Sequence, residues 1–325
     1  MKLLRREFLQ LAAGAAALTA TSRTVSALAY PARPVRIFVG FPPGGTSDIA
    51  ARLIAQWLSE RLGQQFIVEN RSGAAGNIAA EAVVRAPADG YTLLAATASN
   101  IVNAAVHENL SFNFVRDITM IAGIINQPFV LEVNPAFPVN SVAELISYAK
   151  AAPGQTSLAS FGAGTPSHVV GAMFKMRAGI NMIHVPYRGS APMVTDLLGG
   201  RIQAAFDSLP SSIEHIRAGK LRALAVTTAT RPQALSDVST MDEFLPGFEA
   251  SGWVGIGAPS GTPREIIDNL NREINAGLAH STINKRLADL GGEAFVSSPA
   301  GLAKFIAEKA EAWGKVVRAA DIKAE

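Results

Sequence analysis

One order of elements occurs once in each half of this chain: a short apolar strand, a glycine-rich loop and the start of a helix. In the first half, the run from Val35 to Phe41 leads through Pro-Pro-Gly-Gly to Thr46. In the second, the residues LASF lead through Gly-Ala-Gly to Thr165 and Pro166. A continuous apolar run is typical of a strand covered on both faces, and Thr followed by Pro is typical of a helix start. The chain is therefore predicted to be an α/β protein with two doubly wound units.

The rest of the chain continues this alternation. Further strands are predicted at 65–70, 91–97, 156–162, 180–187, 202–208 and 221–228, with helices near 77–86, 141–152 and 165–179. From about Thr262 the pattern becomes mainly helical. Strands that alternate with helices form mostly parallel sheets with right-handed crossovers.

The first 29 residues have the features of an export signal. Basic residues (Lys2, Arg5 and Arg6) precede an apolar tract, and Ala27 and Ala29 form a small-x-small cleavage pattern. The tract is about ten residues long, well short of the roughly 20 of a membrane-spanning helix. The stretch RREFLQ also resembles a twin-arginine motif, so export in the folded state is one alternative to the general route. We expect residues 1–29 to be a signal peptide and the mature protein not to be membrane-embedded.

Removing the leader balances the charge of the chain. The whole sequence has 29 basic and 26 acidic residues, and the leader holds four of the former and one of the latter, which leaves 25 of each. A balanced charge gives no reason to expect a nucleic-acid partner. The mature length exceeds the usual size of one domain, which predicts two. With no cysteine in the sequence, there are no disulfides, and packing alone stabilises the fold.

The two glycine loops are candidate anion sites. Each presents backbone N–H groups at a positive helix end, which is worth roughly 0.3–1 kcal/mol for an anion, and two ends facing one cleft suffice for a carboxylate. Neither loop is followed by the lysine of a phosphate-binding loop, and Gly162, Gly164 and Ser167 match the dinucleotide fingerprint poorly. Tight turns with no ligand are the alternative for either loop alone.

Other residue patterns point away from metal, cofactor and hydrolase chemistry. The five histidines are scattered without the spacing of a metal site, so we predict no metal and no cofactor. The G-x-S-x-G motif is absent, although a Ser/His/Asp site assembled in space stays open. His168, near the second helix start, is predicted to be neutral or structural. Asp207 ends a strand, where open α/β sheets bind ligands, or caps a turn.

A family resemblance joins these features. The stretches FPPGGTSDIAARL, VENRSGAAGNIAAE, DGYTLL, SFGAGTPSH, HVPYRGSAP, DLLGGRIQAAFDS, AGKLRALAVTTATR and GWVGIGAPSGTP occur in the order seen in Bug-type extracytoplasmic receptors of tripartite tricarboxylate transporters. From about Pro34 to the C-terminus, the chain resembles that family. The resemblance implies a type II periplasmic-binding-protein fold, with two lobes around a ligand cleft. It divides the mature chain into lobe 1 (30–130), lobe 2 (131–251) and a segment that completes lobe 1 (252–325), with crossing strands near 128–135 and 252–259.

In such receptors a ligand carboxylate sits between the two glycine loops. We add Thr97 and Ser99 after the third strand, Tyr187 after a later strand, and Asp207. The sequence departs from the family at Asn103–His107, where N-P-x-L-Y is usual, and at Ser208, where Asn is usual; both positions suit contacts to the distal part of a ligand. The predicted ligand-binding residues are Phe41, Gly44, Gly45, Thr46, Asp48, Thr97, Ser99, Ser160, Gly162, Gly164, Thr165, His168, Tyr187 and Asp207.

The sequence thus predicts a non-catalytic, periplasmic solute-binding protein. It would close over a small organic acid and deliver it to the membrane permease of a tripartite transporter. Two alternatives remain open at this point: an exported hydrolase with an unrecognised Ser/His/Asp site, and a ligand receptor that signals to a membrane sensor.

Overall fold

The computed structural model describes residues 30–107, 110–320 and 322. The predicted signal peptide lies outside these residues. Within them, every helix is too short or too polar to cross a bilayer.

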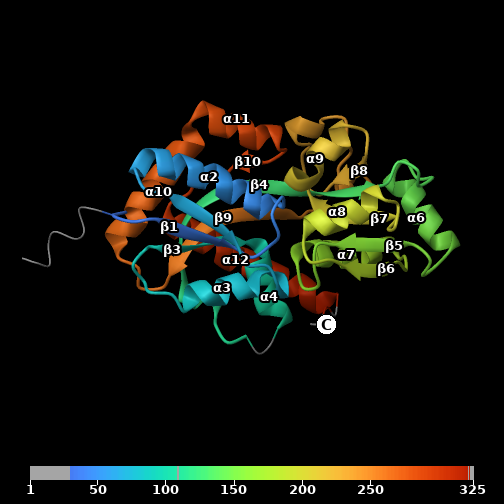
Figure 1. Cartoon of the computed structure of the whole chain (residues 1–325). Coiled ribbons are helices and arrows are strands. Elements are labelled where there is room, and N and C mark those ends of the chain that lie inside the picture. Colours follow the sequence, from blue (N-terminus) through green and yellow to red (C-terminus); the bar gives the residue numbers. More distant parts are fainter. Residues whose placement is uncertain (1–29, 108–109, 321, 323–325) are drawn as a thin grey trace, which may run out of the picture.

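Ten strands of the described residues join in one sheet, which runs through both halves of the molecule (Figure 1). The order is β2-β1-β3-β9-β4-β7-β5-β6, and β8 and β10 pair with β4 beside this path. The strands are β1 (Val35–Val39), β2 (Phe66–Asn70), β3 (Thr92–Thr97), β4 (Ile118–Val133), β5 (Ser157–Ser160), β6 (Ile183–Pro186), β7 (Ala204–Ser208), β8 (Arg222–Val226), β9 (Ser251–Pro259) and β10 (Glu293–Ala294).

The helices pack on both faces of this sheet. In the first lobe, α2, α10 and α11 cover one face, while α3, α4 and α12 cover the other. In the second lobe, α6 and α7 share the core of α12 and α4, and α8 packs on the opposite face of β5 and β7. The helices are α2 (Thr46–Leu62), α3 (Asn77–Val84), α4 (Ala98–Val106), α5 (Phe114–Asp117), α6 (Val142–Ala151), α7 (Pro166–Ala178), α8 (Ser190–Leu198), α9 (Leu209–Arg217), α10 (Arg264–Ala279), α11 (Ser281–Asp289) and α12 (Pro299–Ala319).

The two-lobed α/β fold expected from the sequence is confirmed. Parallel pairing holds for β2-β1-β3 in one lobe and for β7-β5-β6 in the other. The two central strands differ, because β9 is antiparallel to both β3 and β4. Of these strands, β4 pairs with strands of both groups, and β9 runs antiparallel beside its first part.

The strand β4 changes partners midway. Its first part pairs with β9, up to Pro128 opposite Ser251, and its second part pairs with β7, from Phe129 opposite Ser208. The chain returns where the N–H of Ala250, just before β9, donates to the carbonyl of Thr227, just after β8. One point in the sheet is therefore shared by both crossings, and the candidate site lies beside it.

Candidate functional site

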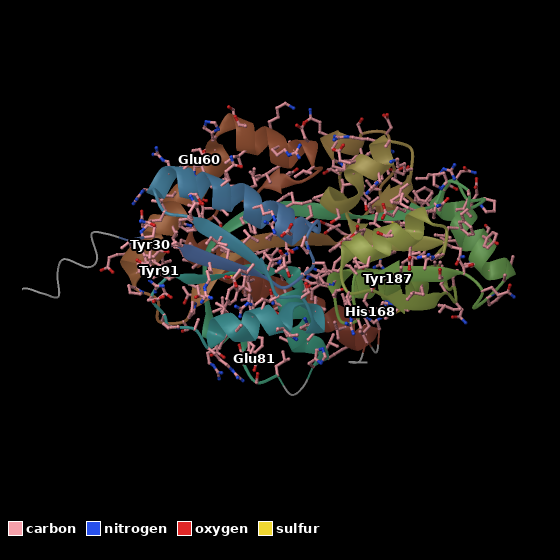
Figure 2. The ribbon with its side chains drawn as sticks, viewed as in Figure 1. Tyr30, Glu60, Glu81, Tyr91, His168 and Tyr187 are labelled. Carbon is pink, nitrogen blue, oxygen red and sulfur yellow. The ribbon has the colours of Figure 1, made fainter. Side chains whose placement is uncertain are left out.

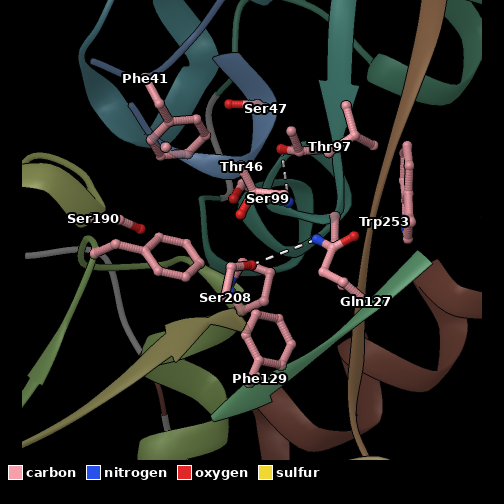
Figure 3. A pocket seen from close by; sticks show the side chains of 16 residues that line it. Phe41, Thr46, Ser47, Thr97, Ser99, Gln127, Phe129, Ser190, Ser208 and Trp253 are labelled. Atoms are coloured by element: carbon pink, nitrogen blue, oxygen red, sulfur yellow. Dashed lines mark hydrogen bonds between the residues drawn. The ribbon is translucent and has the colours of Figure 1, made fainter. Parts of the chain in front are cut away.

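A cavity of about 50 Å³ lies where the two lobes meet (Figure 3). Its walls come from the first glycine loop, from the residues that flank the second, from the ends of β3 and β7, and from the strands β4 and β9. The lining residues are Phe41, Gly45, Thr46, Ser47, Thr97, Ala98, Ser99, Gln127, Phe129, Phe161, Pro166, Ser190, Ser208, Gly252, Trp253 and Val254.

Five helices begin at this cavity. The lining includes the first residues or N-caps of α2 and α4 in one lobe and of α7, α8 and α9 in the other. The first turn of a helix has N–H groups without intrahelical partners and a positive partial charge. The cavity is therefore electropositive at several points of its wall, whereas the sequence had predicted two such helix ends.

All charged side chains of the described residues lie outside the cavity lining. The polar lining groups are hydroxyls of Ser and Thr, the amide of Gln127, the indole N–H of Trp253 and backbone atoms. A site of this kind binds an anion through fixed dipoles and hydrogen bonds, without an ion pair to a basic residue.

Aromatic rings form the apolar part of the wall. Phe41 follows β1 and Phe161 follows β5, and their rings meet edge to face across the lobes, with centroids 6.1 Å apart. The ring centroid of Phe129, on β4, lies 6.3 Å from that of Phe161. The cavity thus offers aromatic rings for the carbon skeleton of a small organic acid and helix N-termini for its anionic group.

Asp48 holds the first glycine loop in place from behind. Its carboxylate accepts from the Gly44 N–H at 3.1 Å, from Arg52 at 3.0 Å and from Asn70 at 2.9 Å. The Asn70 amide also donates to the carbonyl of Phe41 at 2.9 Å. Burial opposes ionisation of Asp48, but these hydrogen bonds outweigh it and lower its pKa. Gly44 and Asp48 shape the loop and lie outside the cavity lining.

The second glycine loop is held in the same way from within its own lobe, by Thr165 and by His168, whose place in that lobe is labelled in Figure 2. The Thr165 hydroxyl donates to the carbonyl of Gly162 at 2.6 Å, and the Gly164 N–H donates to His168 Nδ1 at 3.2 Å. Because Nδ1 accepts here, His168 is in the tautomer with the proton on Nε2. The fully buried Thr165 lies outside the lining, and the Pro166 that follows it lies within.

A histidine pair lies behind this loop. The rings of His168 and His184 stack with centroids 3.9 Å apart, and His184 Nε2 is 2.8 Å from Ser160 Oγ. Burial, followed by the nearby His168 and Lys175, lowers the pKa of His184 to about 3. Ser160 is buried and is not among the cavity-lining residues.

Two further predicted residues lie outside the cavity lining and form hydrogen bonds with other protein groups. The Tyr187 hydroxyl donates to Asp196 Oδ2 at 2.8 Å. Asp207 is fully buried behind the wall, where it accepts hydrogen bonds from Ser190, Ser208 and Ser212.

The lobes touch at the rim of the cavity. The backbone N–H of Thr46 in α2 donates to Ser211 Oγ in α9 at 3.1 Å. Opposite Pro42, Gly189 has φ +115°, and a Cβ there would lie 2.6 Å from the Pro42 ring. Both sides of the cleft are thus in contact at this rim.

Of the predicted ligand-binding residues, Phe41, Gly45, Thr46, Thr97 and Ser99 line the cavity. Sequence reasoning missed the starts of α8 and α9, although Pro210 directly after Leu209 is a helix-start signal that could have revealed the second. Of the two departures from the family pattern, Ser208 lines the cavity, whereas Asn103 and His107 lie against Gly164 on the far side of its loop. Gln127 and Trp253 lie within long strands, where no sequence signal marks them.

The chain matches known proteins over nearly its whole length. Residues 50–322 match the family model described as "Tripartite tricarboxylate transporter family receptor". Protein BugT of Bordetella pertussis is 38% identical over 297 residues, which span 90% of this chain and 91% of BugT.

Two solved structures extend this similarity to the fold. Rpa4515 of R. palustris, solved with adipate, has a TM-score of 0.88 and 40% identity, covering 90% of this chain and 99% of that one. MatC of Rhodopseudomonas palustris, solved with bound malate, has a TM-score of 0.84 and 30% identity, covering 89% and 100%. From its family match, its relatives and its two-lobed fold, this chain belongs to the receptor family of the tripartite tricarboxylate transporters.

Proposed function

We propose that this protein is a periplasmic receptor that captures a small organic acid between its lobes and delivers it to a tripartite-transporter permease. The observation that carries the proposal is the cavity on which five helix N-termini converge, while no charged side chain of the described residues lines it. A carboxylate is the common metabolite group that such a wall stabilises. Two relatives of known structure hold adipate and malate, which are both carboxylates.

The proposed lobe boundaries follow the change of partners in the sheet. Lobe 1 comprises residues 30–130 and 252–325, and lobe 2 comprises residues 131–251. The supporting observation is that β4 leaves β9 after Pro128 and joins β7 at Phe129. We place the hinge at this point, and because α6 and α7 of lobe 2 share one hydrophobic core with α4 and α12 of lobe 1, opening the cleft separates part of that core.

The proposed ligand-binding groups are the N–H and hydroxyl groups of the cavity wall. They come from Gly45 and Ser47 in the first loop and from the hydroxyls of Thr46, Thr97 and Ser99, with Phe41 as an apolar contact. The N–H groups of Thr46, Thr97 and Ser99 already donate within the protein. The remaining predicted residues, Gly44, Asp48, Ser160, Gly162, Gly164, Thr165, His168, Tyr187 and Asp207, act by positioning the loops or the wall. A micromolar dissociation constant corresponds to roughly −8 kcal/mol, which a few such contacts and the burial of a carbon skeleton supply.

We propose that the protein is not a hydrolase. Among the serines of the wall, Ser190 donates to Asp207 rather than to a histidine. The serine that does contact a histidine, Ser160, lies outside the cavity lining. A triad needs its nucleophile at the substrate and its base beside it.

The test introduces a negative charge into the cavity wall, where it would repel a ligand carboxylate. Ser47 lies in the first turn of α2 and lines the cavity, and Asp is well tolerated at a helix N-terminus. Ser47→Asp would therefore preserve the fold. A carboxylate there repels a ligand carboxylate by about 4 kcal/mol at 4 Å and an effective dielectric constant of 20.

We expect calorimetry to show a loss of affinity greater than about 100-fold for Ser47→Asp. Ser47→Asn, which has the same size and no charge, is the control and should retain much of the binding. The acids that bind the wild-type protein are first identified by thermal shift with mono-, di- and tricarboxylates. The proposal fails if no acid shifts the wild-type midpoint, or if Ser47→Asp binds as tightly as Ser47→Asn.

A further inference from the structure

Two buried carboxyl groups lie directly behind the cavity wall, linked by one serine. Glu132 on β4 and Asp207 on β7 are both fully buried. Ser212 Oγ, from α9, lies 2.9 Å from Glu132 Oε1 and 2.9 Å from Asp207 Oδ2. A hydroxyl has one proton, so Ser212 donates to one carboxyl group and accepts from the other.

The environment decides the direction of these hydrogen bonds. Glu132 has one oxygen, Oε2, without a hydrogen-bond partner, a position that strongly disfavours its ionised form. Burial and the charge of Asp207 raise the pKa of Glu132 well above its ordinary value. Asp207, in contrast, also receives the Ser208 N–H at 2.8 Å and the Ser190 hydroxyl at 2.5 Å. The proton therefore resides on Glu132. The Glu132 carboxyl group donates to Ser212, and the hydroxyls of Ser212 and Ser190 both donate to Asp207.

These hydrogen bonds fix the direction in which one hydroxyl of the cavity wall, that of Ser190, donates its proton. Ser190 is the first residue of α8 and lines the cavity. Because its only hydroxyl proton is committed to Asp207, its oxygen offers lone pairs to a ligand. A group that donates a hydrogen bond is stabilised there, and a carboxylate oxygen is not.

The five helix N-termini at the cavity fall into two groups that differ in nearby negative charge. Asp207 precedes Ser208, the N-cap of α9, and contacts the first residue of α8, so its charge compensates both positive ends. The first turns of α4 and α7 contain no acidic residue, and the one in α2, Asp48, is paired with Arg52. The cavity therefore has an anion-binding side at α2, α4 and α7 and an acceptor side at Ser190.

We infer that Ser190, positioned by the buried Asp207, determines the specificity of this receptor for carboxylic acids that also carry a hydroxyl or amino group. This inference rests on the proposed function, since it takes the carboxylate to bind in the same cavity. Glu132, Ser212 and Asp207 are positioning residues, because they act on the ligand through Ser190.

The experiment compares matched acids that differ by one donor: malate and aspartate against succinate, and lactate against propionate. Calorimetry gives the dissociation constant of each for the wild-type protein and for Ser190→Ala. We expect the wild type to prefer the donor-bearing member of each binding pair by about tenfold, and Ser190→Ala to reduce that preference to within about twofold. Malate against aspartate separates a hydroxyl donor from an amino donor.

The control is Ser47→Ala, which removes a lining hydroxyl on the anion-binding side. It should weaken both members of a pair alike and leave the preference unchanged. A folding defect in either variant also lowers both affinities equally, so the ratio reports specificity alone. If acids bind the wild type without preference, or the preference survives in Ser190→Ala, this inference is wrong and the proposed function stands. If none of these acids, nor any other acid of the thermal-shift screen, binds the wild type, the proposed function itself is wrong.

Discussion

Thr46 and Ser211 join the two lobes although they lie 165 residues apart in the sequence. The Thr46 N–H donates to Ser211 Oγ at 3.1 Å, and the two hydroxyl oxygens are 3.0 Å apart. Thr46 is also part of the cavity wall. The same helix end that faces the cavity thus contacts the opposite lobe, so ligand binding and closure are expected to be coupled.

Removing this contact should weaken binding by favouring the open form. A hydrogen bond is worth about 1 kcal/mol, so Ser211→Ala is expected to raise the dissociation constant of a bound acid roughly fivefold. Ser281→Ala, at an exposed serine on α11, is the control and should not change it. Calorimetry measures both. An unchanged affinity in Ser211→Ala would show that this contact does not contribute to closure.

Gly252 is expected to be intolerant of a side chain. It lies opposite Gln127 in the β4–β9 pairing, and a Cβ there would approach the Gln127 amide nitrogen to 2.8 Å and the Phe129 ring to 3.1 Å. Gly252→Ala therefore displaces two residues of the cavity wall, and we expect affinity to fall about tenfold or more.

The matched control for Gly252 is Gly199→Ala. Gly199 ends α8 with an ordinary φ of −77°, and a Cβ there would meet only ordinary contacts of 3.5 Å and more. Titration of both variants with the same acid decides the question. Equal affinities of the two variants would contradict the role assigned to Gly252.

Glu132 is expected to make stability decrease with rising pH. Its folded pKa is raised by burial and by Asp207, so above about pH 4.5 the folded protein keeps a proton that the unfolded chain has lost. Glu132→Gln imitates the protonated acid and removes this dependence. Between pH 4.5 and 8, the melting temperature of the variant should therefore rise relative to that of the wild type as pH increases. If the two proteins show the same dependence of melting temperature on pH, the assignment of the proton to Glu132 is refuted.

His184 should have the opposite effect. Its folded pKa is lowered to about 3, chiefly by burial and then by His168 and Lys175. As pH falls below about 6.5, the unfolded chain takes up a proton at this residue and the folded protein does not, so stability is lost toward acid. His184→Gln should lose less stability than the wild type between pH 7 and pH 5 in denaturant titrations. A loss at least as large in the variant would rule this cause out.

Much of the fold could be predicted from local sequence patterns. The apolar run at β1, the Thr165-Pro166 helix start and the glycine after α7 each depend on neighbouring residues only, and the structure has a strand, a helix start and a left-handed cap at these places. The pairing of β4 could not be predicted from such local patterns. Its 16 residues look like one apolar strand, yet its two parts pair with different lobes.

The candidate site divides in the same way. Phe41, Gly45 and Thr46 adjoin the first glycine loop, whose sequence alone indicates backbone N–H groups at a helix end. Gln127 and Trp253 carry no such signal, because they reach the cavity only through the crossing of two long strands.

The sequence by itself determined the alternation of strands and helices, the two glycine loops and the anion-binding character of their helix ends, because these depend on backbone propensities and capping over a few residues. Only the tertiary structure decided which groups face the ligand. It placed Asp207, a predicted ligand contact, behind Ser190, and set Glu132 beside it, 75 positions away in sequence. Burial, charge and hydrogen-bond direction at such a place are properties of residues brought together by folding, and no local pattern contains them.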